Sequence, residues 1–158
     1  MSVRPVAPDD ATTWLRLRHQ LFSGEAAEHR RDIERFFAGT ASEPLAVLVA
    51  ERNGEVVGMA ELSIRAYANG CSSQGVAYLE GWFVEAASRG LGIGRSLIQA
   101  AEVWGLSRGC SELASDTELE NQASAGAHGA CGLEEVSQIR CFRKPLTRSV
   151  GEDEAGRP

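Results

Sequence analysis

A glycine-rich turn at residues 89–94 places the tightest constraint on what this chain can fold into. The turn reads Arg-Gly-Leu-Gly-Ile-Gly, and it lies between an apolar segment, 76–85, and an amphipathic helix predicted over residues 92–108. Three glycines in five positions let backbone N–H groups converge on one point, where the start of a helix adds partial positive charge. The turn therefore either binds a phosphate group or is a helix start that binds no ligand.

The remaining hydrophobic pattern predicts a chain that alternates strands and helices. Asn53-Gly54 is the strongest hairpin signal, because a type I′ turn needs positive φ at both central positions. Gly81, inside an apolar strand, indicates a bulge or a close backbone approach. The predicted strands cover residues 2–6, 45–52, 55–66, 76–85, 111–115 and 133–146, and the predicted helices cover residues 9–22, 25–38, 92–108 and 121–131.

Length and charge exclude several classes of protein. The chain has 158 residues, so we expect one domain over residues 1–148 and a disordered tail over 149–158. A net charge of -6 argues against a nucleic-acid partner, and it either suits a cationic substrate or serves solubility. No apolar run approaches the ~18 residues of a membrane span, and the first ten residues do not resemble a signal peptide.

The cysteines and histidines point to no redox or metal chemistry. The four cysteines are widely spaced and form no CxxC pair, which is typical of reduced thiols in a cytoplasmic protein. The three histidines are scattered and show no spacing suited to metal ligands. We therefore expect a cytoplasmic protein without a metal ion.

The motif Arg89-x-x-Gly92-x-Gly94, following Phe83-Val84, resembles the acetyl-CoA signature of the GNAT acetyltransferase superfamily, and the order of predicted elements is similar to that superfamily's order. The resemblance implies an α/β fold with a mixed, mostly antiparallel sheet of about six or seven strands. It also implies a splay between the fourth and fifth strands and about four flanking helices. Acetyl-CoA would be the co-substrate, and its implied contacts are Trp82, Phe83 and Val84 at the acetyl-pantetheine arm, Arg89, Gly90, Leu91, Gly92, Ile93 and Gly94 at the phosphates, and Asn121 at the pantetheine.

A closer resemblance covers residues 76–146. Segments 78–84, 109–121 and 132–144 are similar to bacterial aminoglycoside 6′-N-acetyltransferases. The resemblance implies direct transfer of the acetyl group from acetyl-CoA to the 6′-amino group of an aminoglycoside, hence antibiotic resistance, in a homodimer. The implied substrate contacts are Phe22, Glu25, Tyr67, Glu80 and Asp116.

Two acids are the candidate catalytic residues. Glu80 lies inside an apolar strand, where a carboxylate is costly unless it is paired or faces a cleft. It would orient the substrate amine and accept its proton; the alternative is an exposed acid or the partner of a structural arginine. Asp116 ends the next strand in an acidic segment, where it would face a cationic ligand or simply belong to a solvated loop.

Several alternatives stay open at the level of sequence. Many members of the superfamily have a tyrosine seven residues after the asparagine, where it protonates the leaving sulfur; this chain has His128, either a proton donor or a partly buried helix histidine. The substrate could also be a polyamine or a protein amine. A third alternative is a CoA-binding module that catalyses no reaction.

Overall fold

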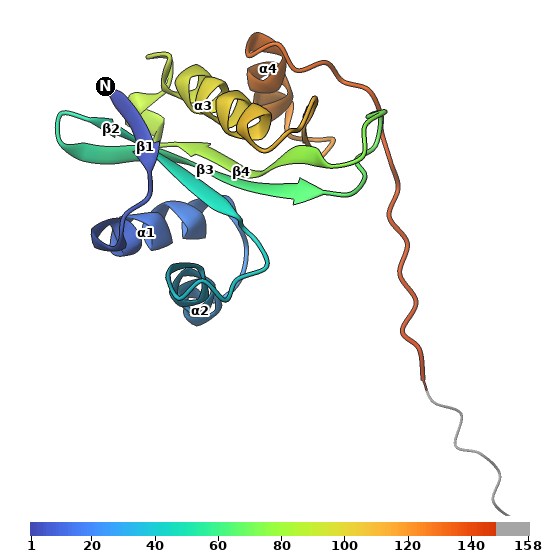
Figure 1. The fold of residues 1–158 in the computed structure, drawn as a ribbon, viewed down its shortest axis with the longest axis horizontal. Helices are drawn as coiled ribbons and strands as arrows, with labels where there is room; N and C mark the ends of the chain where they lie inside the picture. Colours follow the sequence, from blue (N-terminus) through green and yellow to red (C-terminus); the bar gives the residue numbers. More distant parts are fainter. Residues whose placement is uncertain (148–158) are drawn as a thin grey trace, which may run out of the picture.

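The computed structural model describes residues 1–147, so the tail predicted at 149–158 lies outside the described residues. A five-stranded sheet separates two helical layers, with α1 and α2 on one face and α3 and α4 on the other (Figure 1). Two short 3-10 turns, Pro8–Asp10 and Ala86–Ser88, accompany these elements. The strands are β1 (Ser2–Pro5), β2 (Ala46–Arg52), β3 (Glu55–Arg65), β4 (Val76–Val84) and β5 (Leu113–Ser115); the helices are α1 (Ala11–Leu21), α2 (Ala26–Phe37), α3 (Ile93–Ser107) and α4 (Gln122–Ala130).

The strands lie in sequence order, β1-β2-β3-β4-β5. All neighbours are antiparallel except β4 and β5, which pair in parallel through the α3 crossover. The turn between β2 and β3 has φ of 53° at Asn53 and 80° at Gly54, which confirms the predicted type I′ hairpin. The α/β sheet and the four helices of the expected fold are confirmed.

The predicted number of six or seven strands is wrong, because residues 133–146 form no strand. They run as an extended, largely exposed segment away from the sheet (Figure 1). In a strand, three of their four large exposed apolar residues would share one face with Glu134, Gln138, Arg140 and Lys144, and the fourth would lie on the other face, so neither face would be apolar. The four apolar residues are Val136, Ile139, Phe142 and Leu146, and they are between 55% and 92% exposed.

The core has one layer on each face of the sheet. On the α3 face, Leu97 and Ile98 pack against Leu62 and Leu79 of the central strands. On the other face, Trp14, Leu17 and Ile33 pack against Val47 and Met59. Both layers pack against β3, and the α3 layer also packs against β4, so close-packed side chains support these two central strands.

A β-bulge in β4 falls at the candidate catalytic acid. Glu61 pairs with Gly81 and Leu62 pairs with Leu79, so Glu80 is the extra residue. A bulge bends its strand and turns a side chain out of the regular alternation. Gly81 itself pairs with Glu61 and directly follows the extra residue. A Cβ at Gly81 would lie 2.7 Å from Cζ of Phe22, so of the two alternatives predicted for this glycine, the close approach holds at Gly81 and the bulge at its neighbour.

Candidate active site

The predicted splay lies between β4 and β5. Their ladder ends at the pair Leu79 and Ser115, while β4 continues to Val84 alongside β3. Trp82, Phe83 and Val84 therefore extend past the last residue of β5. Strands that separate in this way leave backbone groups of the longer strand open to an extended ligand.

The glycine-rich turn begins α3 with a left-handed backbone. Gly90 has φ of 77° and Gly92 has φ of 80°, values that favour glycine, and Cβ atoms at these positions would meet open space. The first turn of α3 holds no acidic residue, so no carboxylate at the start of the helix repels an anion. Arg89 is exposed and donates from Nε to the Val84 oxygen at 2.9 Å. The turn therefore fits the phosphates of a nucleotide.

Asn121 caps α4. Its side-chain oxygen accepts a hydrogen bond of 3.0 Å from the backbone N–H of Ser124. The oxygen of the side chain makes the cap, so its NH₂ group can donate a hydrogen bond to a ligand. The pantetheine contact implied for Asn121 stays a prediction.

Glu80 is held by an arginine and a serine from β3. Arg65 donates from Nε to Oε1 at 3.0 Å and from a terminal nitrogen to Oε2 at 2.6 Å, and the hydroxyl of Ser63 donates to Oε1. The Glu80 side chain is 18% exposed. The alternative that Glu80 pairs with an arginine is thus part of the structure, and its catalytic role stays a prediction.

Asp116 follows directly after β5 and is linked to Glu80 through two residues. The hydroxyl of Tyr78 donates to Oδ1 of Asp116, and the Arg65 guanidinium lies 3.5 Å from the centre of the Tyr78 ring. Burial and the hydrogen bond to Asp116 raise the pKa of Tyr78 above its ordinary value. Hydrogen bonds to Glu80 raise the pKa of Arg65. The structure therefore connects the two predicted acids in one continuous chain of contacts.

A pocket of about 260 Å³ opens beside Glu80. Phe22 and Glu80, two of the five predicted substrate contacts, line it together, whereas Asp116 does not line it. Glu25 and Tyr67 are not among its lining residues. Glu25 is an exposed residue that precedes α2, and Tyr67 is 67% exposed with its hydroxyl on Oδ1 of Asn69 at 3.2 Å. The other lining residues are Arg18, Glu43, Pro44 and Glu61.

Glu61 is a pocket residue that the sequence analysis missed. Its side chain is 2% exposed, accepts a 2.7 Å hydrogen bond from Nε1 of Trp14 and lies 2.9 Å from Nε of Arg18. Burial raises its pKa in spite of the arginine. A signal was present, because Glu61 is an acid inside an apolar predicted strand, as Glu80 is.

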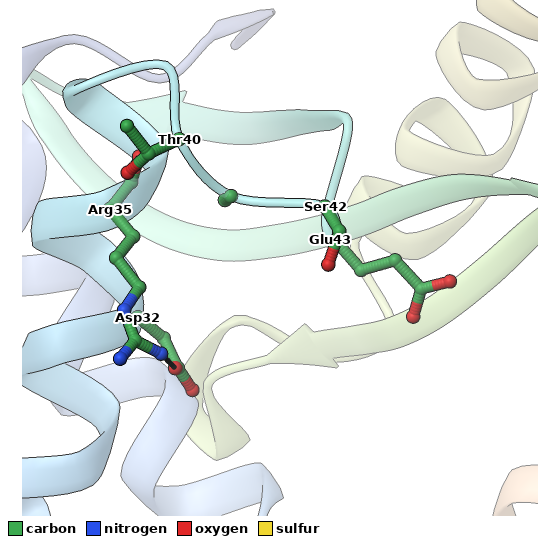
Figure 2. Close-up of a pocket in the computed structure, with 6 residues that line it drawn as sticks. Asp32, Arg35, Thr40, Ser42 and Glu43 are labelled. Carbon is green, nitrogen blue, oxygen red and sulfur yellow. Dashed lines mark hydrogen bonds and ion pairs between the residues drawn. The ribbon is translucent and has the colours of Figure 1, made fainter.

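Glu43 is the second acidic residue of the pocket that was not predicted, because nothing in the sequence around it distinguished it from an ordinary loop acid. It also lines a neighbouring hollow of about 240 Å³ with Asp32, Arg35 and Thr40. In that hollow the Glu43 side chain points away from the ion pair of Asp32 and Arg35 (Figure 2). Glu43 therefore adds a carboxylate that neither member of that pair contacts.

His128 lies between α4 and the end of β5. Its Nδ1 is 2.8 Å from the Ser124 oxygen, and its Nε2 is 3.0 Å from the hydroxyl of Ser115. The ring also packs edge-on against Trp82, with centroids 5.1 Å apart. A carbonyl oxygen only accepts, so Nδ1 carries a proton here. Both alternatives for His128 stay open.

Within residues 1–147, no helix is long and apolar enough to cross a membrane. In the same part of the chain, no cluster of histidine, cysteine and acidic side chains is arranged to hold a metal ion.

Comparisons with known proteins identify relatives over nearly the whole chain. The model of the family described as "Acetyltransferase (GNAT) family" matches residues 10–133. The aminoglycoside N(6′)-acetyltransferase type 1 of Klebsiella aerogenes is 51% identical over 146 residues, which are 91% of this chain and 96% of that enzyme.

Solved structures agree with these sequence matches. The apo aminoglycoside antibiotic 6′-N-acetyltransferase AAC(6′)-IG of Acinetobacter haemolyticus has a TM-score of 0.86 and 32% identity, covering 93% of this chain and 100% of its own. AAC(6′)-Iy, in complex with the bisubstrate analog CoA-S-monomethyl-acetylneamine, has a TM-score of 0.84 and 37% identity, covering 92% and 98%.

Proposed function

Because this chain belongs to the GNAT acetyltransferase family, we propose that it transfers the acetyl group of acetyl-CoA to the 6′-amino group of aminoglycoside antibiotics and so confers resistance. The observation that carries the proposal is the 51% identity to a named aminoglycoside 6′-acetyltransferase along 96% of that enzyme. The matched residues make up 91% of this chain. An enzyme of this kind needs a nucleotide site and an anionic pocket; the acid-free start of α3 supports the first, and the carboxylates of Glu43, Glu61 and Glu80 in the pocket lining support the second.

Acetyl-CoA supplies the acetyl group as a thioester. We propose that its phosphates bind at Arg89, Gly90, Leu91, Gly92, Ile93 and Gly94, its acetyl-pantetheine arm along Trp82, Phe83 and Val84, and its pantetheine at Asn121. The left-handed glycines and the start of α3, which carries no acid, support the phosphate site. The end of β5 at Ser115 supports the site for the arm, because β4 continues beyond it.

The acidic site would bind and deprotonate the substrate. Aminoglycosides are polycations, so their amines favour a site that holds carboxylates. Glu80 and Asp116 would hold the 6′-ammonium and accept one proton from it. The neutral nitrogen then attacks the carbonyl carbon of the thioester, and a C–N bond forms. The C–S bond breaks, the sulfur keeps its electrons, and the nitrogen's second proton passes to the leaving thiolate or to water, which gives the amide. A backbone N–H between Trp82 and Val84 would stabilise the oxyanion that develops.

The contacts to the rest of the antibiotic are less uniform. Phe22 lies in the pocket with Glu80, so it can pack against the apolar face of a sugar ring. Glu25 and Tyr67 lie outside the pocket lining, and any contact they make would be with a part of the substrate that protrudes from it. We therefore propose Phe22 and Glu80 as contacts inside the pocket, and Asp116, Glu25 and Tyr67 as contacts outside its lining.

Steady-state kinetics test the activity directly. The protein is mixed with acetyl-CoA, a thiol reagent and kanamycin, and the release of free CoA is recorded. Parallel reactions contain spermidine or a lysine-containing peptide. Release with kanamycin supports the proposed function. Release with spermidine or the peptide alone would identify a GNAT enzyme of another substrate class, and no release with any amine would indicate a CoA-binding module.

We further propose that residues 1–148 act as one domain, in a cytoplasmic homodimer. Acetyl-CoA is a cytoplasmic metabolite, and the four cysteines are free thiols in the described structure. Residues 133–147 expose Phe142 (91%) and Leu146 (92%), which a second copy of the chain would cover. Light scattering during gel filtration tests the dimer, and a monomer mass for the wild type at micromolar concentration would refute it.

A further inference from the structure

We propose that Arg65 is a positioning residue that sets the two acids of the site relative to each other, with Tyr78 as the link to Asp116. The proposal rests on the proposed function in one respect, since it takes Glu80 and Asp116 as the groups that meet the substrate amine. Arg65 itself would touch neither substrate nor acetyl-CoA. It would act through the side chains that it holds.

The first half of the link joins β3 to the bulge in β4. Arg65 forms two parallel hydrogen bonds with the Glu80 carboxylate, at 3.0 Å and 2.6 Å. A bidentate pair fixes the plane of the carboxylate as well as its position. Such control is needed at this point, because Glu80 is the unpaired residue of the bulge and the regular sheet does not set its direction.

The second half joins β4 to the residue after β5. The guanidinium of Arg65 covers the ring of Tyr78 at 3.5 Å, within the range of a strong cation–π contact. The hydroxyl of Tyr78 then donates to Oδ1 of Asp116. The β4–β5 pairing ends with Leu79 and Ser115, so Asp116, the next residue, is not held in place by hydrogen bonds of the sheet. One guanidinium thus fixes side chains on both sides of the splay.

These contacts give the two acids different roles, ammonium binding for Glu80 and proton acceptance for Asp116. Both oxygens of Glu80 accept hydrogen bonds from cationic or hydroxyl donors, which fix the carboxylate in place to bind the ammonium form of the amine. Among the residues that the structure describes, Tyr78 is the one partner of Asp116, through Oδ1. Its Oδ2 can therefore take the proton from the ammonium and pass it to water. The proton leaves the nitrogen before the C–N bond forms.

Stability alone does not explain this arrangement. The Arg65 side chain is 41% exposed, and ion pairs of exposed arginines contribute little to folding because water screens them and the long side chain loses freedom. Replacing Arg65 should therefore change the geometry of the site far more than the urea midpoint of unfolding. If Arg65 were purely structural, its replacement would lower the urea midpoint more than it would change the geometry of the site.

The test compares Arg65→Met, Arg65→Lys and Tyr78→Phe with the wild type and with Arg108→Met. Arg108 is a matched control, because its guanidinium also lies over an aromatic ring, Trp104 at 5.6 Å, but in the described structure it contacts neither Glu80 nor Asp116 through a hydrogen bond or ion pair. The measurements are kcat and KM for kanamycin, the Kd for acetyl-CoA from fluorescence quenching, and the urea midpoint.

We expect Arg65→Met to lower kcat/KM on the order of 10²-fold, as misplaced reacting groups do. Arg65→Lys should recover part of the KM effect but little of kcat, since one ammonium replaces the charge but not the two-bond geometry. Tyr78→Phe keeps the ring under Arg65 and loses only the hydroxyl, so it should lower kcat roughly tenfold with KM unchanged. The Kd for acetyl-CoA and the midpoint should stay at wild-type values in all three.

Two results would overturn the proposal. One is kcat/KM within about twofold of wild type for Arg65→Met. The other is a loss of activity that parallels a loss of acetyl-CoA affinity or of the urea midpoint, which would make Arg65 structural. If the wild type acetylates spermidine but no aminoglycoside, the proposed function fails, and the same variants measured on spermidine still decide the role of Arg65.

Discussion

Nε1 of Trp14 donates a 2.7 Å hydrogen bond to Oε1 of Glu61, which ties α1 to the centre of β3 beneath the acidic pocket. Both side chains are almost fully buried, at 1% and 2% exposed. Arg18 completes the group from one turn further along α1, at 2.9 Å from the same oxygen. This buried contact gives the floor of the pocket a carboxylate whose environment differs from that of Glu80.

Trp14→Phe should lower the free energy of unfolding by about 1–3 kcal/mol, because it leaves a buried carboxylate oxygen without one of its donors. Urea unfolding followed by circular dichroism measures the loss. Trp104→Phe is the matched control, since Nε1 of Trp104 has no hydrogen-bond partner within residues 1–147. Equal losses for the two variants would mean that ring volume, not the hydrogen bond to Glu61, accounts for the effect.

Glu61 also gives stability a pH dependence of known sign. Burial raises its pKa in the folded state above the ordinary value of about 4.3, so the folded protein binds the proton more tightly than the unfolded chain. The resulting stabilisation is complete below the unfolded pKa and is lost as pH rises through the folded pKa. The stability of the wild type relative to Glu61→Gln should therefore decrease as pH is raised from about 4. A difference that grows with pH in urea unfolding would refute this.

Much of the fold followed from short patterns in the sequence. The type I′ turn needed Asn53 and Gly54, and the helical spacing of Ile93, Leu97 and Ile98 placed α3. Each of these signals is local, because the residue type is required by its own backbone or by its nearest turn. The sheet edge was predicted less well. Residues 133–146 were apolar enough for a strand but lacked the alternation that one face requires.

The site was predicted where single residues stood out and missed where only tertiary contacts define a role. Glu80 was predicted because it is a charged residue in an apolar strand. Glu61 has the same pattern but was not among the predicted site residues. Arg65 did not stand out, because an arginine at a strand end is usually a solvated charge. Its position above Tyr78 and against Glu80 depends on the bulge and on β3–β4 pairing, which a sequence pattern does not specify.

Gly81→Ala should disturb the pocket more than the fold. The new Cβ would lie 2.7 Å from Cζ of Phe22 and 3.1 Å from Cδ2 of Leu21, so the Phe22 ring must move. We expect KM for kanamycin to rise roughly tenfold, equivalent to about 1.4 kcal/mol, with acetyl-CoA binding unchanged. Gly129→Ala is the control, because a Cβ there meets nothing within 4 Å. An unchanged KM in Gly81→Ala would show that Phe22 does not contact the substrate.

The phenol of Tyr78 offers a reporter that does not depend on activity. The chain has two tyrosines, so in a Tyr67→Phe background the ultraviolet absorbance of tyrosinate reports Tyr78 alone. Burial and the hydrogen bond to Asp116 raise the pKa of Tyr78, because the neutral phenol is the form that donates. Adding Asp116→Asn should therefore shift the appearance of tyrosinate to lower pH. A shift to higher pH, or none, would contradict the contact between Tyr78 and Asp116.

Glu80→Gln and Asp116→Asn should reduce catalysis in different ways. Glu80→Gln keeps the shape but removes the charge that holds the substrate ammonium, so its main effect should be a higher KM for kanamycin. Asp116→Asn removes the proton acceptor, and kcat should fall by about 10²- to 10⁴-fold, the usual contribution of a general base. Both variants should keep the wild-type Kd for acetyl-CoA, because neither acid belongs to the glycine-rich turn or to α3.

Glu102→Gln, which replaces an exposed acid of α3, serves as the control for a simple change in net charge. If both site variants lose acetyl-CoA binding in parallel with activity, the two carboxylates support the nucleotide site and do not handle the substrate amine.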